Sequence, residues 1–402
     1  MGLGKTFTGA EKMIQLNGRV NLVVCQKSKV DDWIEHFFNN YNEELFRFDL
    51  TDKIGFKKYF EFIELGLPVV GIINYDLIFR RSELTQIHID TLMLDESSLI
   101  QNESSKRSKF ILRRLQFDNV ILLSGTPTNG KYENLWSQLH LLGWNISKDL
   151  FWKQYVDFEW QDKDGFPIKV VKGYKNVERL KAKLREYGAQ FLKTEEVLNL
   201  PEQVEQIISI PTTKEYRKFK KHSIVDVGNE TLVGDTVLTQ MLYERQLCGH
   251  YNENKLNAFR DILESTDDRL IVFYNFNREL DELMNIADYY DRPISLVNGI
   301  EKNLECYDEY NNSITFVQYQ SGAMGLNLQK ANKIIYFALP LGKGSCGLWE
   351  QSKKRIHRIG QNQTCFYYYL ICKNSIEEWN LEMLKLGKDL TDKLFEEKEM
   401  KR

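Results

Sequence analysis

Short runs of apolar residues, many of them β-branched, alternate along this chain with longer stretches in which apolar positions recur every three or four residues. Uninterrupted apolar runs are typical of strands buried on both faces of a parallel sheet, and the longer stretches are typical of covering helices. The predicted strands are residues 20–25, 68–73, 92–94 and 120–123, then 270–273, 294–297, 314–319, 333–337 and 366–371. The pattern predicts an α/β fold with two parallel sheets in tandem.

A charged and largely helical stretch, from about residue 176 to 264, separates the two groups of predicted strands. Two of the seven prolines, Pro201 and Pro211, bracket the expected boundary between the halves and favour a strand or extended segment between helical pieces. No Gly/Ser-rich linker is present, so ordered helices are expected to join the halves. We expect domains at residues 1–200 and 201–402, the second including a helical connector.

The composition disfavours several classes of protein but does not identify a binding partner. The 402 residues include 54 Lys and Arg against 57 Asp and Glu, a net charge of −3, so any nucleic-acid surface must be a local basic groove. No apolar run approaches the ~20 residues that span a bilayer, and no secretory signal opens the chain. The six scattered cysteines contain no C-x-x-C, which disfavours a disulfide framework or structural zinc and suits a reducing cytoplasm.

The first chemical signal is the segment Gly2-Leu3-Gly4-Lys5-Thr6, which opens a predicted helix from Thr6 to about residue 16. A glycine-rich turn that ends in Lys-Thr at a helix N-terminus can hold phosphates. Backbone N–H groups face the anion, Lys reaches the β/γ-phosphates, and the Thr hydroxyl holds magnesium. The segment is a partial P-loop, because the first glycine of the full pattern would lie before Met1. A flexible glycine-rich terminus is the alternative.

The second signal is a pair of carboxylates, Asp95 and Glu96, directly after the predicted strand at residues 92–94. Side chains at the carboxyl end of a strand in an α/β sheet face the ligand crevice. One carboxylate can hold magnesium through water, and the next can orient or deprotonate an attacking water. The alternative is a pair of acidic caps before the next helix.

The segment from Ser124 to Pro127 also follows a predicted strand directly, and by itself it indicates only an exit turn. Gly322 and Gly325 follow the strand at residues 314–319, where they permit close approach to phosphates or make a tight turn.

The most specific signal is the segment from Gln351 to Gln361, in which Arg355 and Arg358 are three residues apart. On a helix or tight turn they share one face. Paired arginines can reach the γ-phosphate of a nucleotide bound to another domain, and such fingers contribute roughly 10³–10⁵ in rate. A solvated basic face is the alternative.

Taken in chain order, these segments resemble the motifs of superfamily 2 helicases, and among them the SWI/SNF-type ATP-dependent DNA translocases. Residues 2–6 resemble motif I, and residues 23–29 with Trp33 resemble motif Ia. Residues 95–98 resemble motif II in a DESS form, 124–127 motif III, 322–328 motif V and 351–361 motif VI. The resemblance covers nearly the whole chain. It implies two RecA-like domains in tandem that hydrolyse ATP at their interface.

The resemblance also implies residue roles, with ATP and Mg²⁺ as cofactors. Asp95 would hold Mg²⁺ together with Thr6, Glu96 would activate water, and Arg355 and Arg358 would act as fingers. Ser124 and Thr126 would relay nucleotide state to the nucleic-acid groove. The implied nucleotide-binding residues are Gly2, Gly4, Lys5, Thr6, Gly325 and Gln351.

Two departures from the family pattern matter. In the family a strand precedes motif I, but here motif I directly follows Met1 and the strand is missing. This suggests a late start site, a fragment, or a second polypeptide that supplies the strand. Ala338, Leu339 and Pro340 stand where the family has an Asp followed by Trp-Asn-Pro. The nucleic-acid contacts of that segment are therefore not carried over.

The partner implied is duplex DNA, bound without sequence preference by a cytoplasmic protein of compact phage or bacterial type. A strand-separating helicase is one alternative, and a truncated or accessory DNA-binding subunit without its own ATPase activity is another. A P-loop kinase or GTPase is disfavoured by the segment at residues 351–361. Tyr367, Tyr368 and Tyr369 are expected to pack in the sheet. The candidate phosphate-binding clusters, each also interpretable as a solvated helix face, are Lys106, Arg107, Lys109, Arg113 and Arg114; Lys214, Arg217, Lys218, Lys220 and Lys221; and Lys343, Lys353 and Lys354.

Overall fold

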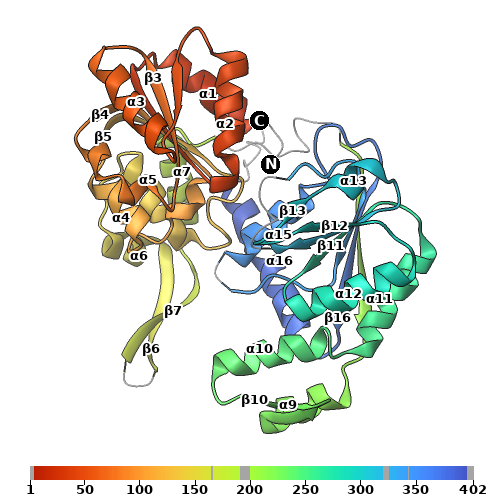
Figure 1. Cartoon of the computed structure of the whole chain (residues 1–402). Coiled ribbons are helices and arrows are strands. Elements are labelled where there is room, and N and C mark those ends of the chain that lie inside the picture. The colour runs from red at the N-terminus through yellow and green to blue at the C-terminus, as the bar shows by residue number, and fades with distance from the viewer. Residues whose placement is uncertain (1–3, 164–165, 191–199, 320–325, 343, 396–402) are drawn as a thin grey trace, which may run out of the picture. The chain divides into compact units, whose positions relative to one another are not determined.

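The chain divides into two compact units, which we call unit 1 (within residues 3–193) and unit 2 (within residues 194–388). This computed structural model describes residues 4–163, 166–190, 200–319, 326–342 and 344–395 (Figure 1). Each unit is built around its own sheet.

The sheet of unit 1 has five parallel strands in the order β2-β3-β1-β4-β5. All four strands predicted here are present, and β2 was not predicted because its four residues form no apolar run. Within the described residues, β5 pairs with β4 alone. The strands are β1 (Val20–Cys25), β2 (Phe46–Asp49), β3 (Val69–Asn74), β4 (His88–Asp95) and β5 (Gln116–Leu123).

Helices cover both faces of this sheet, which explains the continuous apolar runs. Along β1, Leu22 and Val24 pack on one face, while Val23 and Cys25 pack on the other. Gly9 of α1 allows close approach to the sheet, because a Cβ there would lie 2.7 Å from the Leu123 side chain. The predicted helix at residues 6–16 is confirmed within one residue. The helices are α1 (Lys5–Gln15), α2 (Val30–Asn40), α3 (Lys53–Glu64) and α4 (Lys106–Arg113), with short 3₁₀ turns η1 (Lys27–Lys29), η2 (Ile78–Arg80), η3 (Ser82–Thr85) and η4 (Ser97–Ile100).

A small helical cluster and a long hairpin complete unit 1. The hairpin of β6 and β7 extends well beyond the helices that carry it (Figure 1). The sequence pattern did not predict it, because polar and charged residues interrupt the apolar positions of both strands. The elements are η5 (Tyr132–Leu135), α5 (Trp136–Leu141), α6 (Lys148–Tyr155), β6 (Val156–Lys163), β7 (Phe166–Tyr174) and α7 (Val177–Glu186).

The sheet of unit 2 has seven strands in the order β13-β12-β14-β11-β15-β16-β8, parallel except for β13. All five predicted strands are present. Tyr367 and Tyr369 of β16 are fully buried, as expected from sheet packing. The strands are β8 (Gln203–Ile210), β11 (Leu270–Tyr274), β12 (Ile294–Val297), β13 (Lys302–Asn303), β14 (Ile314–Gln318), β15 (Lys333–Tyr336) and β16 (Cys365–Cys372).

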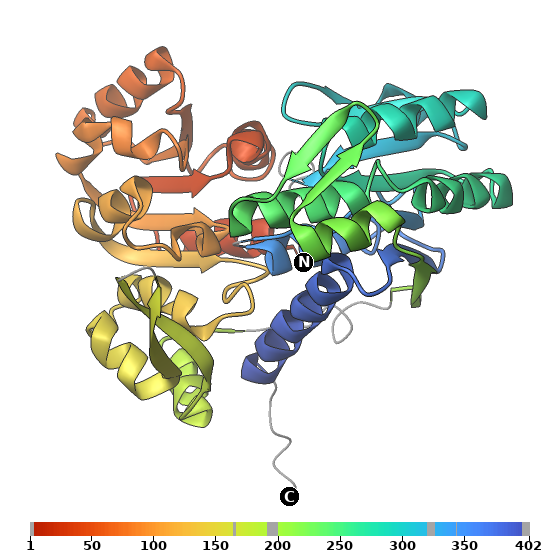
Figure 2. The same cartoon turned by 90° about the horizontal axis from the view of Figure 1, so that it is seen from below.

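The expectation of a largely helical stretch at residues 176–264 was wrong in part. β8 lies in the large sheet beside β16, and a second hairpin joins α9 to α10. Residues 213–248 form what we call the α9–α10 lobe, which faces the viewer in Figure 2. Its elements are α9 (Lys214–His222), β9 (Ile224–Val227), β10 (Glu230–Val233) and α10 (Val237–Cys248).

The remaining helices of unit 2 pack on its sheet through apolar residues on two faces. None of the helices in the described ranges is long and apolar enough to cross a bilayer. The helices that follow the α9–α10 lobe are α11 (Glu253–Ser265), α12 (Asn277–Tyr289), α13 (Glu305–Glu309), α15 (Ser345–Lys353) and α16 (Ile376–Phe395).

Candidate functional site

The predicted phosphate-binding segment of unit 1 begins α1, beside the carboxyl ends of the central strands. Gly4 precedes the helix with a φ of 70°, a left-handed conformation that favours glycine. The first turn of α1 carries no acidic side chain, and its backbone N–H groups have no acceptor within the helix. This helix end is therefore suited to an anion. Gly2, the other glycine predicted here, lies outside the described residues.

Lys5 and the two predicted carboxylates lie together at this edge of the sheet. Asp95 is the last residue of β4, and Glu96 follows with a φ of 55°. The Lys5 Nζ lies 3.5 Å from Glu96 Oε1. The second carboxylate oxygen, Glu96 Oε2, is buried and accepts no hydrogen bond within the described residues. The structure thus brings Lys5 to the adjacent residues Asp95 and Glu96, about 90 positions later in the chain.

Asp95 is held by two side chains that were not assigned a role from the sequence. The Trp33 indole of α2 donates a hydrogen bond to Asp95 Oδ2 at 3.0 Å, and the Tyr75 hydroxyl donates to the Asp95 carbonyl at 3.0 Å. Burial raises the pKa of the Asp95 carboxyl, as does the neighbouring charge of Glu96, whereas the Trp33 hydrogen bond and Lys5 lower it. The motif Ia resemblance named Trp33, but only the fold showed this contact.

A polar bridge joins the segment after β4 to the segment after β5. Asp95 and Leu123 are paired in the sheet, so Ser124–Pro127 begins directly beside the carboxylates. The Ser97 hydroxyl donates to Gln138 Oε1 at 2.9 Å, and the Gln138 amide donates to the Pro127 carbonyl at 2.7 Å. Gln138 of α5 was not predicted, because no local pattern distinguishes it from any helical glutamine.

In unit 2, the two predicted finger arginines lie on one side of the turns after α15, and both reach the same backbone group. The NH1 groups of Arg355 and Arg358 donate to the Leu326 carbonyl, at 3.2 and 3.5 Å. Arg358 also donates to the Asn327 side chain, and burial lowers the pKa of its guanidinium. Gly325, predicted to bind the cofactor, lies outside the described residues, directly before Leu326.

The arginine-bearing segment is tied to β8, the strand that opens unit 2. Lys353, at the end of α15, lies 2.9 Å from Glu205 of β8 and 3.3 Å from Glu350. The His357 ring lies 3.0 Å from the carbonyl oxygen of Pro201, just before β8. Lys353 therefore has carboxylate partners within the protein, which favour a structural role for it. A phosphate contact of its cluster stays a prediction.

The two glutamines of this segment, Gln351 and Gln361, are also buried. Gln351 is 4% exposed. The Gln361 amide donates to the Ala331 carbonyl at 2.8 Å and to the Gln329 carbonyl at 3.1 Å, so it braces the loop before β15. A contact of Gln351 with nucleotide stays a prediction.

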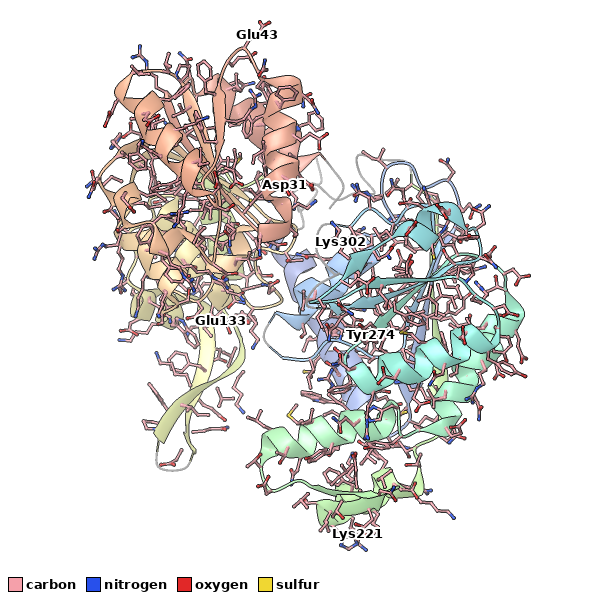
Figure 3. All side chains as sticks on the ribbon, in the orientation of Figure 1. Asp31, Glu43, Glu133, Lys221, Tyr274 and Lys302 are labelled. Carbon is pink, nitrogen blue, oxygen red and sulfur yellow. The ribbon has the colours of Figure 1, made fainter. Side chains whose placement is uncertain are left out.

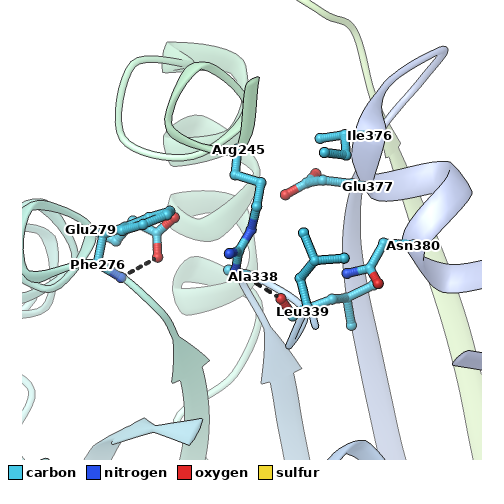
Figure 4. A pocket seen from close by; sticks show the side chains of 9 residues that line it. Arg245, Phe276, Glu279, Ala338, Leu339, Ile376, Glu377 and Asn380 are labelled. Carbon is cyan, nitrogen blue, oxygen red and sulfur yellow. Dashed lines mark hydrogen bonds between the residues drawn. The ribbon is translucent and has the colours of Figure 1, made fainter. Parts of the chain in front are cut away.

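A separate small pocket in unit 2 lies at the carboxyl ends of β11 and β15 (Figure 4). Arg245 of α10 donates to the Leu339 carbonyl at 3.3 Å, while Glu279 accepts from the backbone N–H groups of Asn275 and Phe276. Glu377 accepts from the fully buried Lys255 at 2.6 Å. Opposite charges balance here, and this favours a bracing role over the binding of a charged ligand.

The sequence places these sites in a known family. Residues 1–253 match the SNF2-related domain. The chain belongs to the SNF2-related family. The match includes residues 3–193 of unit 1 and continues through the α9–α10 lobe, so the site around Lys5, Asp95 and Glu96 lies inside it.

The relatives of this SNF2-related chain align with most of its length. The ATPase ISW1 of the ISWI chromatin-remodeling complex of Saccharomyces cerevisiae is 26% identical, covering 95% of this chain and 37% of the relative. YwqA of Bacillus subtilis is 23% identical, covering 98% and 46%. The SWI2/SNF2 ATPase core of Sulfolobus solfataricus, solved in complex with dsDNA, is 21% identical with a TM-score of 0.43, covering 98% of this chain and 86% of that one. The chain spans less than half the length of the first two.

Proposed function

We propose that this chain is a DNA-dependent ATPase that uses hydrolysis to move along duplex DNA without reading its sequence. The observation that carries the proposal is the grouping of Lys5, Asp95 and Glu96 at the start of α1. A phosphate-suited helix end, a lysine and two adjacent carboxylates are the set that ATP hydrolysis requires. Family membership and the names of the relatives agree with this chemistry.

The residues present fit ATP and Mg²⁺. The unpartnered Glu96 Oε2 is available to accept a proton or a hydrogen bond from water, and the Asp95 carboxylate and Thr6 hydroxyl are oxygen ligands of the type that Mg²⁺ prefers. When bound, Mg²⁺ would neutralise charge on the β- and γ-phosphates. Lys5 would exchange its contact with Glu96 for phosphate, and Glu96 would then orient the attacking water.

Arg355 and Arg358 are proposed to complete hydrolysis by acting on nucleotide held by unit 1. Their shared anchor on the Leu326 carbonyl sets both guanidinium groups in one place. The Ser97–Gln138–Pro127 bridge supports a second proposal, that a change at the carboxylates moves the segment at residues 124–127. That segment would relay nucleotide state to DNA. The phage or bacterial origin and the cytoplasmic location stay predictions.

The test is ATP hydrolysis by this chain without nucleic acid and with duplex DNA, single-stranded DNA or RNA, beside a Glu96→Gln variant as the matched inactive control. Strong stimulation by duplex DNA supports the proposal. Preference for single strands would favour strand separation instead. Equal and negligible hydrolysis by both proteins would overturn the motor and favour the accessory DNA-binding subunit.

A further inference from the structure

One face of α9 carries positive charges that no carboxylate among the described residues neutralises. Lys214, Arg217, Lys218 and Lys221 follow the spacing i, i+3, i+4, i+7, which places them on one side of a helix. Tyr216 and Phe219 are buried on the opposite side. With Lys220 included, the nine residues of α9 hold five positive side chains and one negative, Glu215, a net charge of +4 in a chain of net −3.

The side chains of this basic stripe are exposed, and none forms an ion pair in the part of the chain that the structure describes. In α7, by contrast, Lys181 and Lys183 are paired with Glu178 and Glu186. Lys221 lies at the outer edge of the lobe and points away from the rest of unit 2 (Figure 3). The stripe therefore faces solvent and is accessible to a partner.

Helix stability does not explain this arrangement. Lys214 and Lys218, like Arg217 and Lys221, are like charges at i, i+4, and such pairs destabilise a helix. Cations in the first turn also oppose the helix dipole, and Lys214 is the first residue of α9. Only the cations of the last turn, Lys220 and Lys221, are favoured by the dipole. A bound polyanion would offset both the repulsion between the like charges and the unfavourable interaction of Lys214 with the helix dipole.

We propose that the basic stripe of α9 is a second contact surface for the phosphate backbone of duplex DNA, outside the helicase motifs. The stripe is about 10 Å long at 1.5 Å per residue. Along the axis of a DNA duplex this length spans about three phosphates of one strand, at a rise of about 3.4 Å each. Lysine and arginine side chains of this kind bind phosphate without reading sequence. This inference rests on the proposed function, because duplex DNA is the partner assumed.

The test measures duplex binding by fluorescence anisotropy over a range of salt concentrations, using the full chain. In the variant K214Q/R217Q/K218Q/K221Q the negative slope of log affinity against log salt should become shallower by about 2 to 4. Each lost phosphate contact removes about 0.9 from the magnitude of the slope. The control R179Q/K181Q/K183Q/R185Q removes the same charge from α7 and should leave the slope close to that of the wild type. Hydrolysis of ATP without DNA should be equal in all three proteins.

A second variant tests the same surface in the opposite direction. Glu215→Lys adds a cation to α9 and should steepen the salt slope. Thermal melting without DNA should show no loss of stability in the quadruple α9 variant, because the stripe repels itself. An unchanged slope in both α9 variants, with duplex binding and DNA-stimulated hydrolysis intact in the wild type, would overturn this inference and leave the motor function standing. Absence of duplex binding by the wild type would overturn both.

Discussion

The hydrogen bond from Trp33 to Asp95 gives the sharpest prediction about the candidate nucleotide site. Trp33 is 1% exposed, its Nε1 lies 3.0 Å from Asp95 Oδ2, and its ring packs beside Phe37. Trp33→Phe keeps an aromatic ring in place and removes the N–H donor. A hydrogen bond to a charged group contributes about 1.5–3 kcal/mol. If that free energy is lost in the transition state, kcat/KM for ATP falls roughly 10- to 100-fold, at 1.4 kcal/mol per factor of ten.

The pH dependence separates this role from simple packing. The Trp33 hydrogen bond lowers the pKa of Asp95, so its removal raises that pKa further above its ordinary value. In the proposed function Asp95 holds Mg²⁺ only when it is ionised. The acid limb of the activity profile should therefore move to higher pH, and activity should recover partly as pH rises.

The assay is DNA-stimulated ATP hydrolysis across pH, with Trp152→Phe as the control. The Trp152 Nε1 is buried in unit 1 and has no hydrogen-bond acceptor among the described residues, so that variant loses the same atoms but no such bond. Equal losses in the two variants, or an acid limb that stays in place in Trp33→Phe, would refute the reasoning.

Three further predictions concern the carboxylate, the arginines and the contact with β8. Glu96→Gln should bind ATP normally and lose hydrolysis, as measured by nucleotide binding and phosphate release; wild-type turnover would exclude the water-activating role. Arg358→Ala should abolish hydrolysis while sparing DNA binding, and an unchanged ATPase rate would contradict the finger assignment. Glu205→Gln leaves Lys353 with Glu350 as its one carboxylate partner among the described residues. The Glu205 side chain is 37% exposed, so solvent weakens this ion pair. The free energy of unfolding should therefore fall by about 1–2 kcal/mol. A lower melting temperature and a reduced kcat are the expected readouts. The exposed Glu202→Gln is its control, and equal melting of the two variants would contradict a bracing role.

Much of the α/β framework could be predicted, because burial on both faces of a parallel strand leaves a local signature. The apolar runs of β1, β11 and β16 show no polar alternation, since helices cover both faces of each sheet. Strands without such a run escaped prediction. β2 is short, and β6 and β7 form a hairpin whose exposed residues interrupt the apolar pattern.

The candidate site divides in the same way. The motif residues Lys5, Asp95 and Glu96 were recognisable from residue type and order, because each follows or precedes a predictable element. The side chains that contact the carboxylate segment were not, since Trp33 reaches Asp95 from 62 positions away and Gln138 reaches Ser97 from 41 positions away. Nothing in the local sequence specifies such a contact.

The basic residues show the same limit most plainly. From the sequence, the clusters around Lys214 and Lys353 were equivalent runs of positive charge. The fold pairs Lys353 with Glu205, 148 residues earlier. It leaves the stripe of α9 facing solvent, with no carboxylate partner in the part of the chain that the structure describes. The sequence alone determined which residues are charged and which strands are buried. Tertiary structure decided which charges are neutralised, because ion pairing depends on distances between segments that are remote along the chain.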